Sequence, residues 1–380
     1  MTRTWFAPGR IELVGKHVDY GGGRSLTCAI DLGIRATVQP IDEPALRVVD
    51  PERRHQVSVP LSPDTVAAGP HWNTYSTAVA RRFARDFPAA RRGAEVTLES
   101  TLPTSAGLSS SSALVVLLGQ ALADANGLDT DATWLDAMPT PFERAEYFAA
   151  METGSPFGPF AGDTGVGTRG GAQDHVAIVC AEAGFVSQCS YLPARLERRI
   201  AWPDAYVLAV AVSGVKATKT GAAQGDYNRA SDALRLALGE GHGAASGGFS
   251  EAYLARRLAQ FREECGEIVP GVADALAAGD LAEVGRLASR SQQLAEDVLE
   301  NQVAETVSLA RSARSLGAVA ASAFGAGFGG AVWAMVLERD VVEFLGTWRR
   351  EYERAFPVRA RRARWIVTRP SAGMREETAQ

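Results

Sequence analysis

Apolar residues recur at helical spacing in several segments, with shorter apolar runs between them. Trp72, Tyr75, Val79 and Phe83 fall on one face of 71–85, as in an amphipathic helix. The same patterns predict strands at 11–14, 25–30, 34–39, 46–49, 94–100, 175–180, 184–188, 206–212, 331–337 and 364–368. They predict helices at 71–85, 111–125, 141–151, 227–238, 250–264, 271–277, 280–297, 302–314 and 339–354.

Strands and helices are mixed in both halves of the chain without regular alternation. This pattern favours an α+β fold of two domains with a cleft between them, and a length of 380 residues agrees with two domains. We expect domains at 1–200 and 201–370, and a flexible tail at 371–380. The Gly- and Pro-rich segment 153–171 is expected to be a long loop, either a lid or a substrate-selecting wall.

Composition narrows the class of protein. Hydrophobic residues make up 46% and charged residues 22% of the chain, and the net charge is -5, so no broad basic surface for nucleic acid is expected. There is no apolar run of transmembrane length and no signal-peptide pattern. The four cysteines lack metal-binding spacing and are expected to be reduced thiols. We therefore expect a cytoplasmic protein, a monomer or weak homodimer, without membrane or nucleic-acid partners.

A turn of small residues leads into an apolar helix at Pro103–Ala113, with the sequence PTSAGLSSSSA. Small side chains let backbone N–H groups approach an anion, and a helix N-terminus adds unpaired donors, so phosphate is a natural ligand. A serine-capped helix explains the segment equally well. The GxxxxGK[ST] pattern is absent from the sequence, so this is not a P-loop.

Two other glycine-rich segments are weaker signals by themselves. Ala7–Tyr20 places Arg, Lys, His, Asp and Tyr side chains between glycine turns, where they could hold a polyol or form an exposed charged turn. Gly325–Gly330 is explained by a tight turn.

Taken together and in this order, the three segments resemble the motifs of the GHMP kinases, and most closely those of the galactokinase branch. The family patterns GRxNLIGEHxDY, PxGxGLSSSA and GGGFGG correspond to Gly9–Tyr20, Pro103–Ser112 and Gly325–Gly330. The resemblance implies an N-terminal domain like domain 2 of ribosomal protein S5 and a ferredoxin-like C-terminal domain. It also implies an ATP-dependent kinase that phosphorylates a sugar, at the anomeric hydroxyl.

The resemblance also implies roles for individual residues. Asp174 would be the base that accepts the proton of the sugar hydroxyl, and Arg10 would keep it ionised and stabilise the transferring phosphoryl group, although Arg10 could also form a purely structural ion pair. The implied substrate-binding residues are Lys16, His17, Asp19, Gly171 and Tyr227. The implied ATP-binding residues are Trp72, Ser105, Ala106, Gly107, Leu108, Ser109, Ser110 and Ser111.

The metal ion expected with ATP is Mg²⁺, which prefers oxygen ligands. The resemblance suggests Ser111 and Glu146 as its ligands, with Glu143, one helical turn away, as the alternative to Glu146. His175, next to the expected base, is predicted to be a packed or surface histidine rather than a catalytic one.

The chain departs from the family pattern at Lys16, where galactokinases carry a Glu that reaches the hydroxymethyl end of galactose. A lysine there could pair with an acidic sugar, a phosphorylated sugar or a cyclitol phosphate, or only with Glu12 or Asp19 nearby. Ser105 replaces a family glycine and costs some backbone freedom.

Two other functions stay open. One is a catalytically weak sugar and ATP sensor, which the intact Asp174, Arg10 and serine run argue against. The other is a kinase of homoserine or mevalonate, which His17-x-Asp19-Tyr20 and the segment around Tyr227 argue against.

Overall fold

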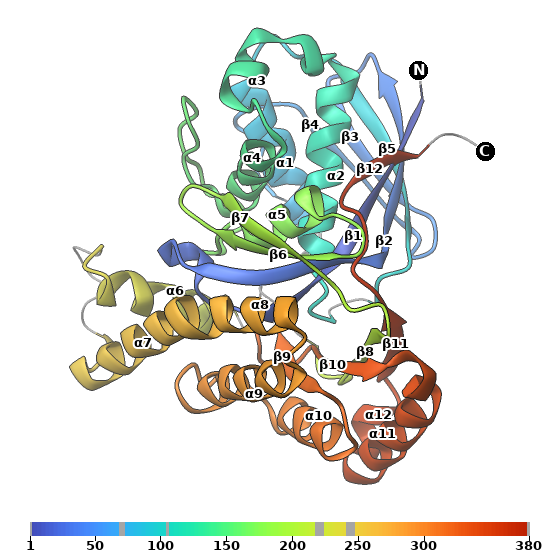
Figure 1. The fold of residues 1–380 in the computed structure, drawn as a ribbon. Coiled ribbons are helices and arrows are strands. Elements are labelled where there is room, and N and C mark those ends of the chain that lie inside the picture. Colours follow the sequence, from blue (N-terminus) through green and yellow to red (C-terminus); the bar gives the residue numbers. More distant parts are fainter. Residues whose placement is uncertain (1, 68–72, 104–105, 217–223, 241–247, 378–380) are drawn as a thin grey trace.

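The computed structural model describes residues 2–67, 73–103, 106–216, 224–240 and 248–377 (Figure 1). These residues form two β-sheets with helices packed against them. The strands of the larger sheet are β1 (Arg3–Val14), β2 (Arg24–Ile41), β3 (Ala45–Asp50), β4 (His55–Pro60), β5 (Gly93–Ser100), β6 (Phe185–Ser190), β7 (Arg195–Ala201) and β12 (Arg375–Glu377). The order is β12-β1-β2-β5-β3-β4, and β6 pairs with both β2 and β7.

The two strands predicted at 25–30 and 34–39 are one long strand, β2. It pairs antiparallel with β1 and β5, while its first residues, Arg24–Thr27, pair with β6. In β1, every residue from Phe6 to Val14 is buried. Strands flank β1 at its edges, and helices pack against its side chains. A strand buried on both faces holds its side chains in fixed positions, and the residues of the first motif lie at its end.

Helices of the first half lie on one side of the larger sheet, and the first, second and fifth of them contact its strands (Figure 1). They are α1 (Asn73–Asp86), α2 (Ser110–Ala125), α3 (Ala132–Ala137), α4 (Pro141–Thr153) and α5 (Gln173–Cys180). The broad apolar face predicted for α2 contacts β1, β2 and β5. The predicted α2, α1 and α4 helices are confirmed within a few residues at their ends.

The smaller sheet contains β8 (Tyr206–Val212), β9 (Ala320–Phe324), β10 (Ala331–Leu337) and β11 (Arg364–Thr368) in the antiparallel order β11-β8-β10-β9. Helices separate β8 from β9 and β10 from β11, so the connection follows the β-α-β-β-α-β pattern of a ferredoxin-like unit. The α+β class and the ferredoxin-like second half are confirmed. The helices of this half are α6 (Gln224–Ala237), α7 (Glu251–Glu263), α8 (Val269–Ala278), α9 (Leu281–Asp297), α10 (Ala304–Ser315), α11 (Val341–Ala355) and α12 (Pro357–Ala360).

The chain passes from the larger to the smaller sheet between Ala201 and Tyr206, but the packing does not stop there. Helix α8 of the second half lies against β2, β6 and β7 of the larger sheet. One cluster of buried hydrophobic residues includes Leu117 of α2 as well as Leu208 and Trp333 of the smaller sheet. The two halves are therefore joined by a continuous apolar core.

Two predicted elements are wrong. Residues 175–180 are not a strand but lie in helix α5, because a short apolar run such as VAIVC does not distinguish a buried strand from a buried helix. The predicted tail at 371–380 is not free over its described part. Strand β12 pairs with β1, with Thr4 opposite Glu377, and Ser371 bridges to Ala29.

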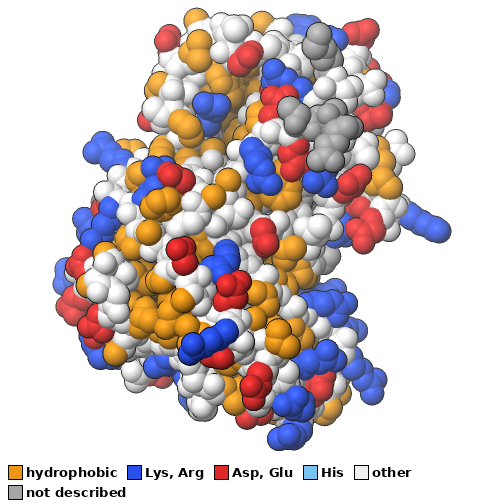
Figure 2. All heavy atoms as spheres, turned by 45° about the vertical axis from the view of Figure 1, so that its right-hand side comes forward, with side chains coloured by type: hydrophobic (Ala, Val, Ile, Leu, Met, Phe, Trp, Pro, Cys, Tyr) orange, Lys and Arg blue, Asp and Glu red, His pale blue; other side chains and the backbone are white. Residues whose placement is uncertain are grey.

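Charged side chains of both signs are interspersed over the face in Figure 2, at least among its described residues. On this face, the described residues therefore mix both signs of charge rather than forming one broad basic surface. Within the described ranges, no helix is both long enough and apolar enough to span a bilayer.

Candidate active site

The three glycine-rich segments meet around the guanidinium group of Arg10. Arg10 Nη1 donates to the carbonyl oxygen of Gly107 at 2.6 Å, and the backbone N–H of Arg10 donates to Leu108 O at 3.3 Å. Gly325 has a φ of +79°, and a Cβ there would lie 3.2 Å from Gly107 O and 3.3 Å from Arg10 Nη2. The close approach and the left-handed backbone both favour glycine at this position.

Arg10 also holds the carboxylate that the motif predicts as the base. Its Nε donates to Asp174 Oδ1 at 2.7 Å, and the two residues are 1% and 6% exposed. Asp174 lies in the first turn of α5, where the helix dipole favours a negative charge. Both side chains line one pocket, so the structure brings the two predicted catalytic residues together.

Four of the predicted substrate-binding residues line the same pocket. Asp19 begins the 3₁₀ turn η1 (Asp19–Gly21), and its Oδ2 accepts a hydrogen bond from the backbone N–H of Gln173 at 3.2 Å. A Cβ on Gly171 would lie 2.5 Å from that oxygen, so only glycine fits there. The ring centroids of His17 and Tyr227 are 5.6 Å apart. The four lining residues are His17, Asp19, Gly171 and Tyr227.

The first motif is held from behind by the second half of the chain. His17 lies between Tyr20 Oη, 3.0 Å from Nδ1, and Ala326 O, 3.1 Å from Nε2. The guanidinium group of Arg257 on α7 donates to His17 O and to Tyr20 Oη. Residues that are distant in sequence therefore fix the orientation of the histidine.

Lys16 is not brought into the pocket. Its Nζ donates to Ser291 Oγ at 2.9 Å, and that hydroxyl donates to Glu264 Oε1 at 2.6 Å. The other oxygen of Glu264 accepts from the backbone N–H of Gly15 at 3.0 Å. Burial lowers the pKa of Lys16 and raises the pKa of Glu264, while each opposes the shift of the other. This position does not support the expectation that Lys16 contacts substrate. Its hydrogen bond goes to neither Glu12 nor Asp19, although its charge lowers the pKa of Glu12.

The predicted ATP-binding turn precedes α2 as expected. Gly107 has a φ of +79° and Ser109, the N-cap residue, a φ of +60°. The buried Oγ of Ser109 has no hydrogen-bond partner among the described residues. Ala106 and Leu108 are buried, and Ser110 opens the helix. Trp72 and Ser105 lie outside the described residues.

The two predicted glutamates of α4 have structural partners elsewhere. Glu146 Oε1 accepts from the backbone N–H of Ala194 at 2.7 Å. Glu143 forms a capping box with Thr140 at the start of α4, and hydrogen bonding from Thr140 lowers its pKa. Neither glutamate lines the pocket, so this geometry does not support the prediction that one of them holds Mg²⁺ there.

A third glutamate of α4 does line the pocket. Glu152 Oε2 accepts from Ser112 Oγ at 3.0 Å and lies 3.1 Å from His175 Nε2. At about 100° per residue, Glu152 and Glu146 lie about 120° apart around the helix axis, which explains their different surroundings. His175 is buried, as expected for a packed histidine, and it also lines the pocket. Ser112 lines the pocket, whereas Ser111 does not.

Ser112 and Glu152 offer Mg²⁺ a hydroxyl and a carboxylate oxygen, the hard ligands that it prefers. Among the described residues, no group of three or more His, Cys, Asp and Glu side chains could hold a metal ion. Mg²⁺ bound with a nucleotide needs only one or two protein ligands, because phosphates and waters supply the rest. The residues present therefore fit this ion.

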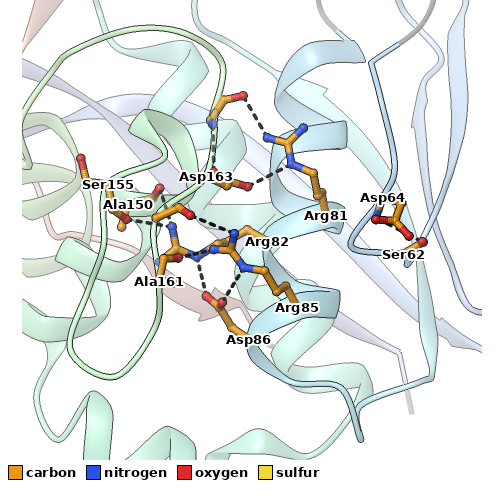
Figure 3. Close-up of polar contacts among 12 residues, drawn as sticks. Ser62, Asp64, Arg81, Arg82, Arg85, Asp86, Ala150, Ser155, Ala161 and Asp163 are labelled. Atoms are coloured by element: carbon orange, nitrogen blue, oxygen red, sulfur yellow. Dashed lines mark hydrogen bonds and ion pairs between the residues drawn. The ribbon is translucent and has the colours of Figure 1, made fainter.

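The long loop 153–171 is fastened to α1 by three arginines (Figure 3). Arg81 Nε donates to Asp163 Oδ2 at 2.9 Å, Arg82 Nη1 to Ser155 O at 2.8 Å and Arg85 Nη1 to Gly162 O at 3.0 Å. Further along, Thr168, Gly170 and Gly171 line the pocket. These contacts favour the interpretation of the loop as a fixed wall over that of a lid.

Several residues that line the pocket were not predicted from the sequence as site residues. They are Glu12, Ser112, Glu152, Thr168 and Gln173. For Glu12 a signal existed, because in a strand it lies on the same face as Arg10. Glu152 and Ser112 offered none, because nothing in the helical pattern of α4 or the serine run shows which residue faces the pocket.

Comparisons with known proteins agree with this arrangement. Residues 2–40 match the galactokinase galactose-binding signature, 74–147 the GHMP kinase N-terminal domain and 272–354 the GHMP kinase C-terminal domain. A galactokinase of Chloroflexus aggregans is 29% identical over 90% of this chain and 86% of its own length. A galactokinase of Lacticaseibacillus casei is 36% identical, but over only 31% of each chain.

Solved structures agree in fold. The crystal structure of Lactococcus lactis galactokinase complexed with galactose has a TM-score of 0.79 at 20% identity, covering 98% of this chain and 95% of that one. The Methanococcus jannaschii mevalonate kinase has a TM-score of 0.60 at 14% identity, covering 98% of each chain.

The three matched family models and the shared fold make this chain a GHMP kinase, an enzyme that transfers a phosphoryl group from ATP to a small molecule. Within the GHMP kinases it belongs to the galactokinase-like branch, as its match to the galactokinase signature and its relatives over most of the chain show.

Proposed function

We propose that this enzyme transfers the γ-phosphoryl group of ATP to the anomeric hydroxyl of galactose or a closely related sugar. One observation carries the proposal. The Arg10–Asp174 pair stands where the pocket lined by His17 and Asp19 meets the turn before α2. The similarity to galactokinases over most of the chain supports galactose as the first substrate to test.

In this proposal Asp174 accepts the proton of the attacking hydroxyl. The hydroxyl oxygen forms a bond to the γ-phosphorus, and the bond from that phosphorus to the bridging oxygen breaks to release ADP. A carboxylate is a modest base, so most of its effect comes from position. Arg10 contacts both Asp174 and the carbonyl of Gly107. Its permanent positive charge keeps the base ionised and stabilises the transferring phosphoryl group.

The backbone of Gly107–Ser110 would cradle the phosphates of ATP at the N-terminus of α2. Mg²⁺ would be held by Glu152 and Ser112 together with the phosphates. When bound, the metal ion neutralises charge on the phosphate oxygens. For Trp72 and Ser105, the proposed contacts with ATP are supported only by the resemblance to the family motifs.

The pocket argues against an anionic acceptor. Four carboxylates line it, and Arg10 is the one Lys or Arg among its described lining residues. Lys16, which motivated an acidic or phosphorylated substrate, donates to Ser291 instead. A neutral polyol suits such a surface, because carboxylates accept hydrogen bonds from its hydroxyl groups. The four carboxylates are Glu12, Asp19, Glu152 and Asp174.

The test is an assay of ATP consumption with Mg²⁺ and galactose, galacturonate or a hexose phosphate, with Asp174→Asn as the control. We expect turnover with galactose that is lost in the variant. Turnover with only an anionic sugar would contradict galactose as the substrate. No turnover with any sugar would favour the sensor interpretation, which the intact Arg10–Asp174 pair argues against.

A further inference from the structure

We propose that Glu12 is a specificity-determining residue of this enzyme, whose carboxylate binds one hydroxyl group of the acceptor substrate. The inference rests on the proposed function, because it concerns the same pocket and assumes a hydroxylated acceptor.

The strand places Glu12 beside the catalytic pair. Alternate residues of a strand point to the same side, so Glu12 follows Arg10 on the face that α5 covers. Its side chain contacts Gln173, the residue before Asp174. Glu12 is 2% exposed, and it lines the pocket together with Arg10 and Asp174.

The two oxygens of this carboxylate differ in their surroundings. Oε2 accepts from Gln173 Nε2 at 2.6 Å. Oε1 is buried and has no hydrogen-bond partner among the described residues. A buried carboxylate oxygen without a partner is unfavourable. A substrate hydroxyl in the pocket would supply the missing hydrogen bond, which makes this oxygen a natural contact point for the acceptor.

Gln173 connects Glu12 to the rest of the acceptor pocket. Its side chain donates to Glu12, and its backbone N–H donates to Asp19 Oδ2 at 3.2 Å. Two carboxylates are thus held by one residue at the start of α5. Such fixed acceptors can select the positions of hydroxyl groups on a sugar ring.

The position of Lys16 explains why a carboxylate at position 12 can serve as a hydrogen-bond acceptor in the pocket. The family pattern has Asn at position 12 and Glu at position 16, whereas this chain has Glu12 and Lys16. The ammonium group of Lys16 is directed to Ser291, so position 16 supplies no acceptor to the pocket. The carboxylate of this segment lies instead at Glu12, next to Asp174, and the substrate hydroxyl that it binds is expected to differ accordingly.

Glu12→Gln tests the proposal, because the amide keeps the size of the side chain and can still bond to Gln173. The assay is run at about pH 8.5, where the Glu12 carboxyl group, with a pKa raised by burial to about 7, is ionised. It measures kcat and KM with galactose and with 2-, 3-, 4- and 6-deoxygalactose, for the wild type and for Glu12→Gln. Glu264→Gln is the matched control, because Glu264 is a buried carboxylate that does not line the pocket.

We expect Glu12→Gln to raise KM for galactose by about 10-fold or more, the usual effect of weakening a hydrogen bond to a charged group, with KM for ATP unchanged. For one deoxygalactose, the one that lacks the bound hydroxyl, wild type and variant should have equal kcat/KM. Glu264→Gln should leave the order of preference among the sugars unchanged.

Two results would overturn the proposal while the proposed function holds. One is wild-type turnover of galactose with the same fold-change for every sugar in Glu12→Gln. The other is a fall in kcat with no change in KM, which would make Glu12 a positioning residue that acts through Gln173. If the wild type phosphorylates none of these sugars, the proposed function fails, and this inference fails with it.

Discussion

Two buried cation–carboxylate arrangements lie on the same N-terminal segment and differ in what they face. Arg10 contacts Asp174 directly at 2.7 Å, and both line the pocket. Lys16 reaches Glu264 through the hydroxyl of Ser291, outside the pocket and against α9 and η5 (Glu264–Ile268). The first pair can touch substrates, whereas the second joins the motif to the helices of the second half.

The difference teaches that burial and charge do not by themselves mark a functional residue. Arg10 and Lys16 are both 1% exposed, and both belong to the segment that resembles the family's first motif. Their surroundings differ, because Arg10 lines the pocket and contacts the turn before α2, whereas Lys16 is surrounded by other protein side chains. Substitutions in each pair can test this division between a proposed catalytic pair and a structural pair.

The largest effect is expected for Arg10→Lys. Arginine donates from Nε to Asp174 and from Nη1 to Gly107 O, and the single ammonium group of lysine cannot reproduce this planar arrangement. We expect kcat to fall by about 10²–10³, the usual loss when one donor to the transition state is removed. Single-turnover kinetics with saturating Mg²⁺ and ATP measures this. A rate within threefold of the wild type would show that Arg10 is only structural.

The second effect is expected on stability. Lys16→Met leaves Glu264 buried without its cation and should lower the free energy of unfolding by about 3 kcal/mol at neutral pH. Urea denaturation measures this, with Lys16→Met/Glu264→Gln as the matched variant that should recover most of the loss. Sugar preference should change less than in Glu12→Gln, because Lys16 does not line the pocket and acts on it only through its charge on Glu12. Loss of turnover at unchanged stability would instead return Lys16 to the substrate site.

The sequence indicates the class of fold and the proposed catalytic pair because these depend on local patterns. Helix α2 follows from a broad apolar face, and β10 and β11 from short apolar runs with turns on either side. Arg10 and Asp174 follow from motifs whose residues stay close in sequence. Such features need no knowledge of what lies across the pocket.

The rest depends on contacts between distant residues. The partners of Lys16 are Ser291 and Glu264, which no motif connects to it. That Glu152 rather than Glu146 lines the pocket depends on the rotation of α4 about its axis, which tertiary packing sets. The helical state of α5 is likewise decided by its packing on α4 and β1, not by the local run VAIVC.

Glu12, which lies between the two pairs, should show a smaller effect that depends on pH. Burial raises its pKa from 4.5 to about 7, although Lys16, Arg10 and the hydrogen bond from Gln173 lower it and Asp174 raises it. In the folded protein the carboxyl group therefore keeps its proton up to about pH 7, whereas the unfolded chain releases it near pH 4.5. Its contribution to stability is fully present below pH 4.5 and is lost as the pH rises through 7.

Glu12→Gln removes this titration. We expect equal stability of variant and wild type below pH 4.5 and a gain of about 2–3 kcal/mol for the variant above pH 7. Urea denaturation between pH 4 and pH 9 checks this. A constant difference across that range would show that Glu12 does not carry a raised pKa. A gain in stability together with weaker sugar binding would identify Glu12 as a residue kept for function at the expense of stability.

The smallest effect extends the comparison to the two glutamates of α4. Glu146→Gln weakens one hydrogen bond from the backbone of Ala194 and should lower the free energy of unfolding by about 1 kcal/mol or less. Glu152→Gln, the matched variant on the same helix, changes a carboxylate that lines the pocket. A titration of the rate against Mg²⁺ should need several-fold more metal for Glu152→Gln and the wild-type amount for Glu146→Gln. The opposite result would place the metal ligand on the other face of α4, because the two carboxylates lie on different sides of that helix and cannot both reach the turn before α2.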